Sequence, residues 1–281
     1  MHEERAFTFA CGDQRLVGIL SLPKAPAPAP APAPTRGVVI VVGGPQYRAG
    51  SHRQFTLLAR DLADAGIPAL RFDYRGMGDS EGAQRDFETV EADLRAAIDA
   101  FFIQQPQLRE VALFGLCDGA TAAALYAPND ARVAGLALVN PWVRTEAGAA
   151  RATVSHYYTD RLLQGGLWRK IARGEFDAAG AARSAWRNLR AMFASSGVDA
   201  LPARMYAQLQ RFDGAVLLIL SGADLTAQEF AGVAGSSRGW RRLLKRPRVT
   251  RRDLAGADHT FSRRPWHDTM LGWTRDWMRA W

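Results

Sequence analysis

The sequence predicts an α/β fold built on a mostly parallel, doubly wound sheet. Continuous apolar runs such as GVVIVVGG and AVLLILSG are typical of strands buried on both faces. Segments with helical spacing of apolar residues separate these runs, and the connections between strands and helices are short. In sheets of this kind, ligands bind at the carboxyl ends of the strands.

The size and composition of the chain fit one large domain with a sizeable core. The chain has 281 residues, of which 48% are hydrophobic and 23% charged. No apolar run approaches the roughly 20 residues that a membrane-spanning helix needs. The first residues, MHEERAFTFACGD, lack the apolar segment of a secretory signal. We therefore expect a cytoplasmic protein without a transmembrane segment.

The expected elements begin with a hairpin and continue as alternating strands and helices. ERAFTFACG and QRLVGILSLP form the hairpin, and the Ala/Pro-rich stretch 24–36 forms an extended loop, because alternating proline prevents a ladder or a helix. The strands expected next are 37–44, 67–76, 110–115, 133–140 and 215–222, and the helices between them are 51–66, 86–104 and 118–127.

The alternation stops between 141 and 213. This stretch has no buried-strand run, and its Leu, Trp, Phe and Met residues recur at helical spacing on basic faces. We expect a mostly helical cap over 141–213, inserted into a core made of 1–140 and 214–281. Candidate substrate-binding residues are Tyr157, Tyr158 and Trp168 of the cap, together with His52.

The C-terminal part of the chain completes the expected core. The basic stretch 237–254 predicts a helix followed by the last strand. The closing segment, RRPWHDTMLGWTRDWMRAW, predicts an amphipathic helix. We expect its tryptophans, Trp266, Trp273, Trp277 and Trp281, to pack on the sheet.

The charge of the chain is strongly basic, at a formal +8, and the basic excess is almost all arginine. GC-rich coding is one explanation. The other is an anionic substrate or partner, such as an acyl group on a phosphopantetheine carrier or a nucleotide-bearing thioester, because arginine binds carboxylate and phosphate in bidentate fashion. No nucleic-acid recognition motif is visible, so we expect no nucleic-acid partner.

The cysteines, Cys11 and Cys117, are too few for a disulfide framework. Neither has a CxxC or His-spaced partner, so we expect no metal site and no cofactor. Cys117 instead lies in FGLCDGA, between the strand EVALFG and a helix. The frame Gly115-Leu116-Cys117-Asp118-Gly119 usually holds a serine at its centre, on a tight strand-to-helix turn. Cys117 is therefore the predicted nucleophile, and the helix that follows favours its thiolate.

The predicted acid and base follow the nucleophile in the chain. Asp224 comes just after the strand 215–222, where an aspartate holds the imidazole tautomer, and Glu229 is the alternative acid. His259, in GADHTFS, lies between the last strand and the last helix and is the predicted base. Asp79 comes too early in the chain to be the catalytic acid, and its turn, RFDYRGMGDSEG, is interpreted as structural.

The oxyanion hole is expected to use backbone N–H groups. One belongs to Asp118, the residue after the nucleophile. The second comes from the loop VVGGPQYRAG, in which Pro45 has no N–H, so either Gly44 or Gln46 supplies it. The Asp118 side chain is interpreted either as a helix cap or as a group that steers a cation.

These motifs together resemble the α/β-hydrolase superfamily over nearly the whole chain. VVGGPQYRAGSHRQF and FGLCDGA more narrowly resemble the exosortase A system-associated hydrolases of type 1, a bacterial group found with exopolysaccharide and protein-sorting gene clusters. The resemblance implies a hydrolase fold and a Cys-His-Asp triad, without naming a substrate. Dienelactone hydrolases and bile-acid acyltransferases also have cysteine nucleophiles, so the cysteine alone does not define the reaction.

Three functions are consistent with these residues. The first is an acyl hydrolase, an esterase or thioesterase that acts on a small-molecule or carrier-linked acyl group. The second is an acyltransferase with the same triad, and the third is a weakly catalytic scaffold within a polysaccharide assembly. A cysteine thiolate favours activated acyl donors such as thioesters and aryl esters. The sequence leaves the acyl group, the acceptor and the oligomeric state open.

Overall fold

The computed structural model describes residues 2–24, 34–44, 46–143 and 201–280. The chain divides into two compact units, one made of Met1–Trp142 with Met205–Trp281 and the other of Val143–Arg204. Most of the expected cap, including Tyr157, Tyr158 and Trp168, lies outside the described residues, as does most of the Ala/Pro-rich loop.

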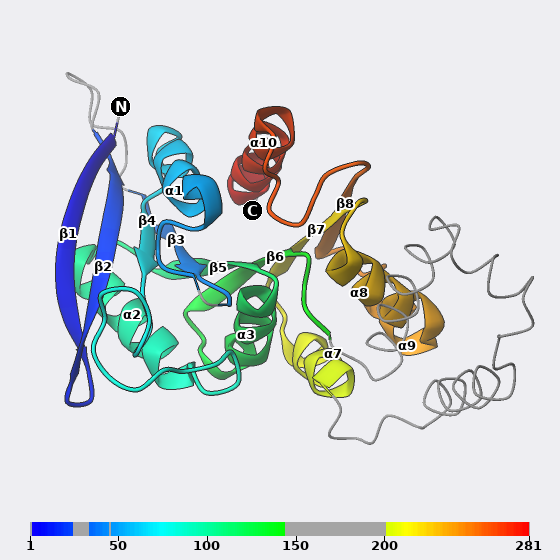
Figure 1. Ribbon diagram of the computed structural model, residues 1–281, viewed down its shortest axis with the longest axis horizontal. Coiled ribbons are helices and arrows are strands. Elements are labelled where there is room, and N and C mark those ends of the chain that lie inside the picture. Colours follow the sequence, from blue (N-terminus) through cyan, green and yellow to red (C-terminus); the bar gives the residue numbers. More distant parts are fainter. Residues whose placement is uncertain (1, 25–33, 45, 144–200, 281) are drawn as a thin grey trace, which may run out of the picture. The chain divides into compact units, whose positions relative to one another are not determined.

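The described residues form an eight-stranded, mostly parallel sheet (Figure 1), as the sequence predicts. Its strands are β1 (His2–Cys11), β2 (Gln14–Pro23), β3 (Arg36–Val41), β4 (Ala69–Phe72), β5 (Glu110–Leu116), β6 (Val133–Val139), β7 (Ala215–Ser221) and β8 (Val249–Leu254). Their order is β1-β2-β4-β3-β5-β6-β7-β8. The hairpin partner β2 pairs antiparallel with β1 and with β4, whereas β3 to β8 run parallel to one another.

Helices cover both faces of this sheet. They are α1 (Gln54–Asp64), α2 (Glu91–Gln104), α3 (Asp118–Tyr126), α7 (Leu201–Arg211), α8 (Leu225–Ser236), α9 (Arg238–Leu243) and α10 (Arg264–Ala280), with short 3-10 turns η1 (Ser51–Arg53) and η2 (Ala127–Asn129). Figure 1 shows α1 and α10 on one face and α2 and α3 on the other. Because β3 to β8 run parallel, their carboxyl ends all lie at one edge of the sheet, and the predicted catalytic residues follow these ends.

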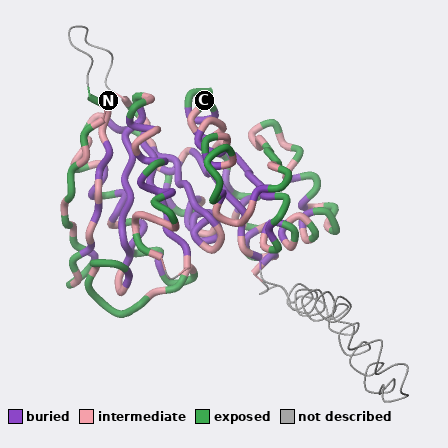
Figure 2. Tube along the Cα trace, turned by 45° about the horizontal axis from the view of Figure 1, so that its top comes forward, coloured by how far each residue is buried: buried purple, intermediate pink, exposed green. Residues whose placement is uncertain are grey.

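Burial follows the position of each strand in the sheet. Almost every residue of β3, β5, β6 and β7 is buried, because these central strands are covered on both faces. The edge strand β1 mostly alternates between half-buried and exposed residues, as a strand packed on one face does. Figure 2 shows this contrast between the buried centre and the more exposed outer strand β1.

Several elements differ from the sequence-based prediction for local reasons. The strand expected over 67–76 is confined to β4, because the chain turns after Tyr74, whose carbonyl accepts the Met77 N–H at 3.0 Å. The helix expected from residue 51 begins at Gln54, since His52 and Arg53 have positive φ. The helix expected from residue 86 begins at Glu91, after a turn in which the Thr89 hydroxyl donates to the Asp86 carboxylate at 2.9 Å. The helix α8 was not predicted at all.

The last helix buries fewer tryptophans than predicted. Its buried residues are His267, Met270, Leu271, Thr274, Trp277 and Met278. Trp266 and Trp273 are only half-buried, since they flank this stripe rather than lie on it, and Trp281 is outside the described residues. Within the described ranges, no helix is both long enough and apolar enough to cross a membrane.

Candidate active site

Cys117 lies at the sharp turn between β5 and α3. Its backbone has φ 60° and ψ −125°, a conformation that is unfavourable for any residue with a side chain. The surrounding structure holds it there, because the Cys117 N–H donates to the Val139 carbonyl at 2.9 Å and the Trp142 N–H donates to the Cys117 carbonyl at 3.2 Å. Cys117 is half-buried, forms no disulfide, and directly follows the carboxyl end of β5.

The glycines on either side of Cys117 are required by close backbone packing. A Cβ atom on Gly115 would lie 2.4 Å from the carbonyl carbon of Gly119, which is shorter than any real contact. A Cβ atom on Gly119 would lie 2.5 Å from the Val41 carbonyl oxygen. The first glycine lets α3 fold back on β5, and the second lets α3 approach the end of β3. This is the physical reason for the Gly-x-Cys-x-Gly frame.

Asp224 and His259, 35 residues apart in the chain, meet beside this turn. The His259 Nδ1 atom lies 2.9 Å from the Asp224 Oδ2 atom. Asp224 is buried and is also the N-cap of α8, where its carboxylate accepts the N–H groups of Thr226 at 3.2 Å and Ala227 at 3.0 Å. These bonds hold the carboxylate in one orientation, in which its Oδ2 atom can also accept a hydrogen bond from the imidazole. Glu229, the alternative acid, lies within α8 itself.

The imidazole of His259 is strongly basic in this environment. Its hydrogen bond to Asp224 and a second hydrogen bond to Cys117 raise the pKa of His259 to about 10, although burial opposes the shift. His259 is therefore protonated at neutral pH. The structure thus brings together the three side chains of the predicted triad, with the imidazole between the carboxylate and the thiol.

The Asp118 side chain lies beside the backbone N–H groups predicted for the oxyanion hole. Its carboxylate accepts the Gly44 N–H at 2.8 Å and the Gly119 N–H at 3.1 Å. Gly44 is therefore not a free donor in this structure, because its N–H already binds a carboxylate that reaches it from the first residue of α3. Burial raises the pKa of Asp118, and hydrogen bonds from the N–H groups of Gly44, Gly119 and Asp118 itself oppose this. The Gly44 bond favours Gln46 as the second donor, and this assignment stays a prediction.

An ion pair anchors the loop that contains Gln46. Arg48 pairs with Asp73, which is buried, and its backbone N–H donates to the Asp73 carboxylate at 2.6 Å. Arg48 also pairs with Asp79 at 2.6 Å, so Asp79 faces the arginine rather than the imidazole. Arg48 was not predicted as a site residue from the sequence. The available signal was an aspartate directly after a buried strand, together with an arginine in the loop that follows β3.

The other candidate residues lie around the triad or outside the described ranges. His52 is exposed, has φ 42°, and its ring centroid lies 6.2 Å from that of the buried His267. Backbone strain of this kind is common near functional sites. Gln46 accepts the Ser51 N–H at 3.2 Å through its side chain, which ties its loop to the turn that carries His52.

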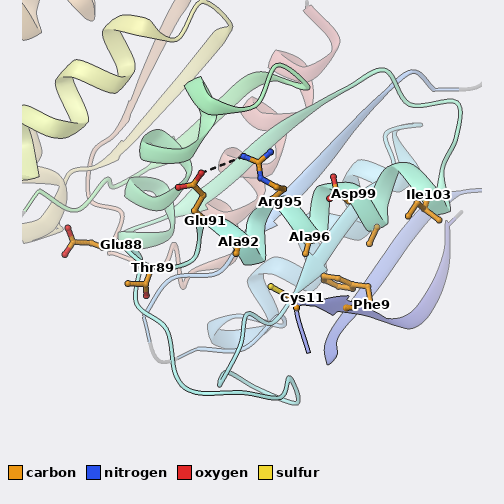
Figure 3. Close-up of a pocket in the computed structure, with 13 residues that line it drawn as sticks. Phe9, Cys11, Glu88, Thr89, Glu91, Ala92, Arg95, Ala96, Asp99 and Ile103 are labelled. Carbon is orange, nitrogen blue, oxygen red and sulfur yellow. Dashed lines mark ion pairs between the residues drawn. The ribbon is translucent and has the colours of Figure 1, made fainter. Parts of the chain in front are cut away.

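A separate groove of about 840 Å³ lies between β1 and α2 (Figure 3). Cys11, Phe9 and Ile103 line it, and the triad residues do not. Its charged side chains are paired, Glu91 with Arg95 at 3.7 Å and Asp99 with Arg132 at 2.6 Å. The groove is therefore not the catalytic site. Over the described residues, no cluster of three or more His, Cys, Asp or Glu side chains is placed to hold a metal ion.

The family of the chain follows from a comparison with family models. Residues 33–229, more than half of the chain, match the model Hydrolase_4, described as serine aminopeptidase, S33. The chain belongs to this hydrolase family. The match covers the Cys117 turn and Asp224 and ends before His259. The family is named for serine enzymes, whereas this chain has a cysteine at the turn. No curated protein matches the sequence significantly.

Solved structures show that this member of the family has the α/β-hydrolase fold. The Pyrococcus furiosus esterase Pf2001 matches with a TM-score of 0.67 at 13% identity, over 100% of this chain and 92% of that one. Est1E from Butyrivibrio proteoclasticus, solved with ferulic acid bound, matches with a TM-score of 0.62 at 14% identity, over 98% and 100% of the two chains. The Xanthomonas campestris α/β serine hydrolase XC6422, described as lacking a lid, matches with a TM-score of 0.59 at 18% identity, over 99% and 95%.

Proposed function

We propose that this hydrolase is an esterase or thioesterase that acts through Cys117, His259 and Asp224. The observation that carries the proposal is the position of His259, whose Nδ1 atom lies 2.9 Å from the buried Asp224 carboxylate while the ring also hydrogen-bonds Cys117. A base held by a third group beside a nucleophile on a strained turn is the arrangement that acyl transfer requires. A scaffold protein has no need of this arrangement.

The proposed reaction has two steps. In the resting site the proton is on His259, and Cys117 reacts in its thiolate form, which is the nucleophilic form of a cysteine. The thiolate sulfur attacks the acyl carbon, and the carbonyl oxygen becomes an oxyanion that the N–H groups of Asp118 and Gln46 stabilise. The C–O or C–S bond to the leaving group then breaks as His259 donates its proton to that group. The product of this step is a thioester acyl-enzyme on Cys117.

Water completes the cycle. His259, now neutral, accepts a proton from the attacking water, whose oxygen adds to the thioester carbon. When the carbon–sulfur bond breaks, the acid is released and Cys117 leaves as a thiolate, with the proton again on His259. Asp224 stays ionised throughout and holds the imidazole in one orientation.

A cysteine nucleophile favours activated acyl donors. Attack on a thioester exchanges one thiolate for another and is nearly balanced, whereas an alkyl ester needs its leaving alkoxide protonated as it departs. An amide is harder still, so we do not propose the aminopeptidase activity in the family name. The ferulic acid bound to a structural neighbour supports a small aryl ester as one substrate class.

Two further features narrow the proposed substrate. The formal charge of +8, mostly arginine, supports an anionic acyl donor. The resemblance of GGPQYRAGSHRQF and GLCDGA to exosortase A system-associated hydrolases supports an acyl group from exopolysaccharide metabolism. Both are proposals from the sequence.

Turnover of p-nitrophenyl acetate and of acetyl-CoA tests the proposed function. Cys117→Ala should lower kcat/KM by roughly a thousandfold or more on any donor that is turned over, because nothing else in the site attacks the acyl carbon. Cys11→Ala is the matched control, since it removes the other thiol of the chain, which is buried away from the triad. Equal activity of the two variants would contradict the proposal.

A further inference from the structure

Asn140, the residue after β6, joins three parts of the chain through its side-chain amide. It is fully buried. Its Oδ1 atom accepts the Ser221 N–H at 2.8 Å, and its Nδ2 group donates to the Ser221 hydroxyl at 2.9 Å and to the His259 carbonyl at 3.0 Å. Both N–H bonds of the amide and its oxygen are therefore used.

The backbone of Asn140 is also unusual. Its φ is 45°, in the left-handed region, and its N–H donates to the Ile219 carbonyl at 2.9 Å. Asparagine and glycine tolerate this region better than other residues. Unfavourable backbone angles of this kind persist only where neighbouring contacts determine them. Side chain and backbone thus attach Asn140 to the end of β7.

The two segments that Asn140 holds are the ones that carry the acid and the base. Ser221 is the last residue of β7 and precedes Asp224 by three residues, and the other bond is to the backbone of His259 itself. The His259 ring is 35% exposed, so packing alone does not enclose it. The side-chain amide of Asn140 therefore fixes the backbone segments that carry Asp224 and His259 relative to each other.

We propose that Asn140 is a positioning residue that sets the separation of Asp224 and His259 and directs the imidazole at Cys117. This inference rests on the proposed function of the triad. Asn140 touches none of the three reacting groups, so its effect passes through the loops it holds. Its removal should leave substrate binding largely intact and slow the chemical step, since misplacement by about 1 Å costs on the order of a hundredfold in rate.

Two variants of Asn140 and one matched control test this. Asn140→Gly suits the positive φ and removes all three side-chain bonds. Asn140→Asp keeps the shape and the acceptor for the Ser221 N–H but loses the bond to the His259 carbonyl. Ser221→Ala is the control, because it removes a single hydroxyl and leaves the link between Asn140 and His259 in place.

We expect Asn140→Gly and Asn140→Asp to lower kcat by roughly 10- to 100-fold with KM changed less than about threefold, and Ser221→Ala to stay within about threefold of the wild type. The titration of the His259 ring, followed by NMR, is the second readout. It should move to lower pH in Asn140→Gly, because the imidazole loses its alignment with Asp224, and stay unchanged in Ser221→Ala. Among the described residues, Asp224, Cys117 and Asp118 are ionisable groups that interact with this ring.

The NMR titration separates the two proposals, because it reads the imidazole without any turnover. If no acyl donor is hydrolysed by the wild type, a shifted titration in Asn140→Gly still supports the positioning role while the proposed function fails. The positioning role is overturned if kcat and the titration are unchanged in both Asn140 variants. It is also overturned if Ser221→Ala reproduces their losses, or if the losses match only a smaller folded fraction.

Discussion

His259 links the two steps of the proposed reaction, because the same imidazole donates a proton to the leaving group and later accepts one from water. Its bonds to Asp224 and Cys117 hold the proton on the ring at neutral pH. His259 can thus act as a general acid beside the proposed nucleophile. Removal of Asp224 or Cys117 should therefore change how the stability of the protein depends on pH, as well as its activity.

The stability of the protein should depend on pH through His259. The pKa of His259 is raised from its ordinary value of 6.5 to about 10, so its stabilising contribution is complete below about pH 6.5 and is lost as the pH rises through 10. In urea unfolding between pH 6 and 10, the free-energy difference between wild type and His259→Gln should shrink as the pH rises. Asp224→Asn should weaken this dependence. A difference that is constant with pH would contradict the account.

The roles of single residues could be predicted from the sequence where a short local motif identified them. Cys117 was recognisable from its glycine frame, and Asp224 and His259 from their places after two strands. The engagement of Gly44 was not predictable, because the carboxylate that binds it is 74 residues away in the chain. Asn140 was also missed, since a polar residue at the end of a buried strand looks like an ordinary turn residue until its partners are known.

At the scale of elements, the turn between β5 and α3 depends on backbone contacts that leave no room for a side chain. The helix α3 packs against β5 through Gly115 and Gly119 and against the end of β3 through Gly119. The dipole at its N-terminus points toward Cys117 and the proposed oxyanion position. Stability and chemistry therefore depend on the same packing.

Gly115→Ala should destabilise the protein and reduce activity. The added methyl group would lie 2.4 Å from the Gly119 backbone, and overpacking of this kind costs about 1–3 kcal/mol. The control is Gly235→Ala in α8, where a Cβ atom meets nothing within 4 Å. That change should stabilise the protein by about 0.5–1 kcal/mol, because alanine is the better helix former.

Urea unfolding and acyl-donor turnover measure both effects. Gly115→Ala should lose activity at urea concentrations where it is still fully folded, because the Cys117 turn moves. Gly235→Ala should keep wild-type kcat. A Gly115→Ala variant as stable and as active as the wild type would show that the turn does not need its glycine.

The elements that the sequence predicted well were the buried strands, whose continuous apolar runs leave few alternatives. The helix α8 was missed because its sequence, LTAQEFAGVAGS, is rich in small residues and only three of its residues are buried. The helix expected from residue 51 begins later because His52 and Arg53 have positive φ values, which the helical spacing of apolar residues does not reveal.

At the scale of the whole molecule, the proposed site assembles from distant parts of one core. Gln46, Cys117, Asn140, Asp224 and His259 follow five different strands that end at the same edge of the sheet. The core chain runs up to Trp142, whose N–H donates to the Cys117 carbonyl. The expected helical cap over 141–213 begins at this point of the chain and stays a prediction.

Intact-protein mass spectrometry after incubation with p-nitrophenyl acetate or acetyl-CoA tests the central claim most directly. The wild type should gain one acetyl group, mapped to Cys117, and the adduct should be absent in Cys117→Ala and form slowly in His259→Ala. Its decay in water would mark a hydrolase, and its discharge only by an added acceptor a transferase. An adduct on Cys11, an adduct that persists in Cys117→Ala, or neither adduct nor turnover with both donors would contradict the assignment of Cys117 as the nucleophile.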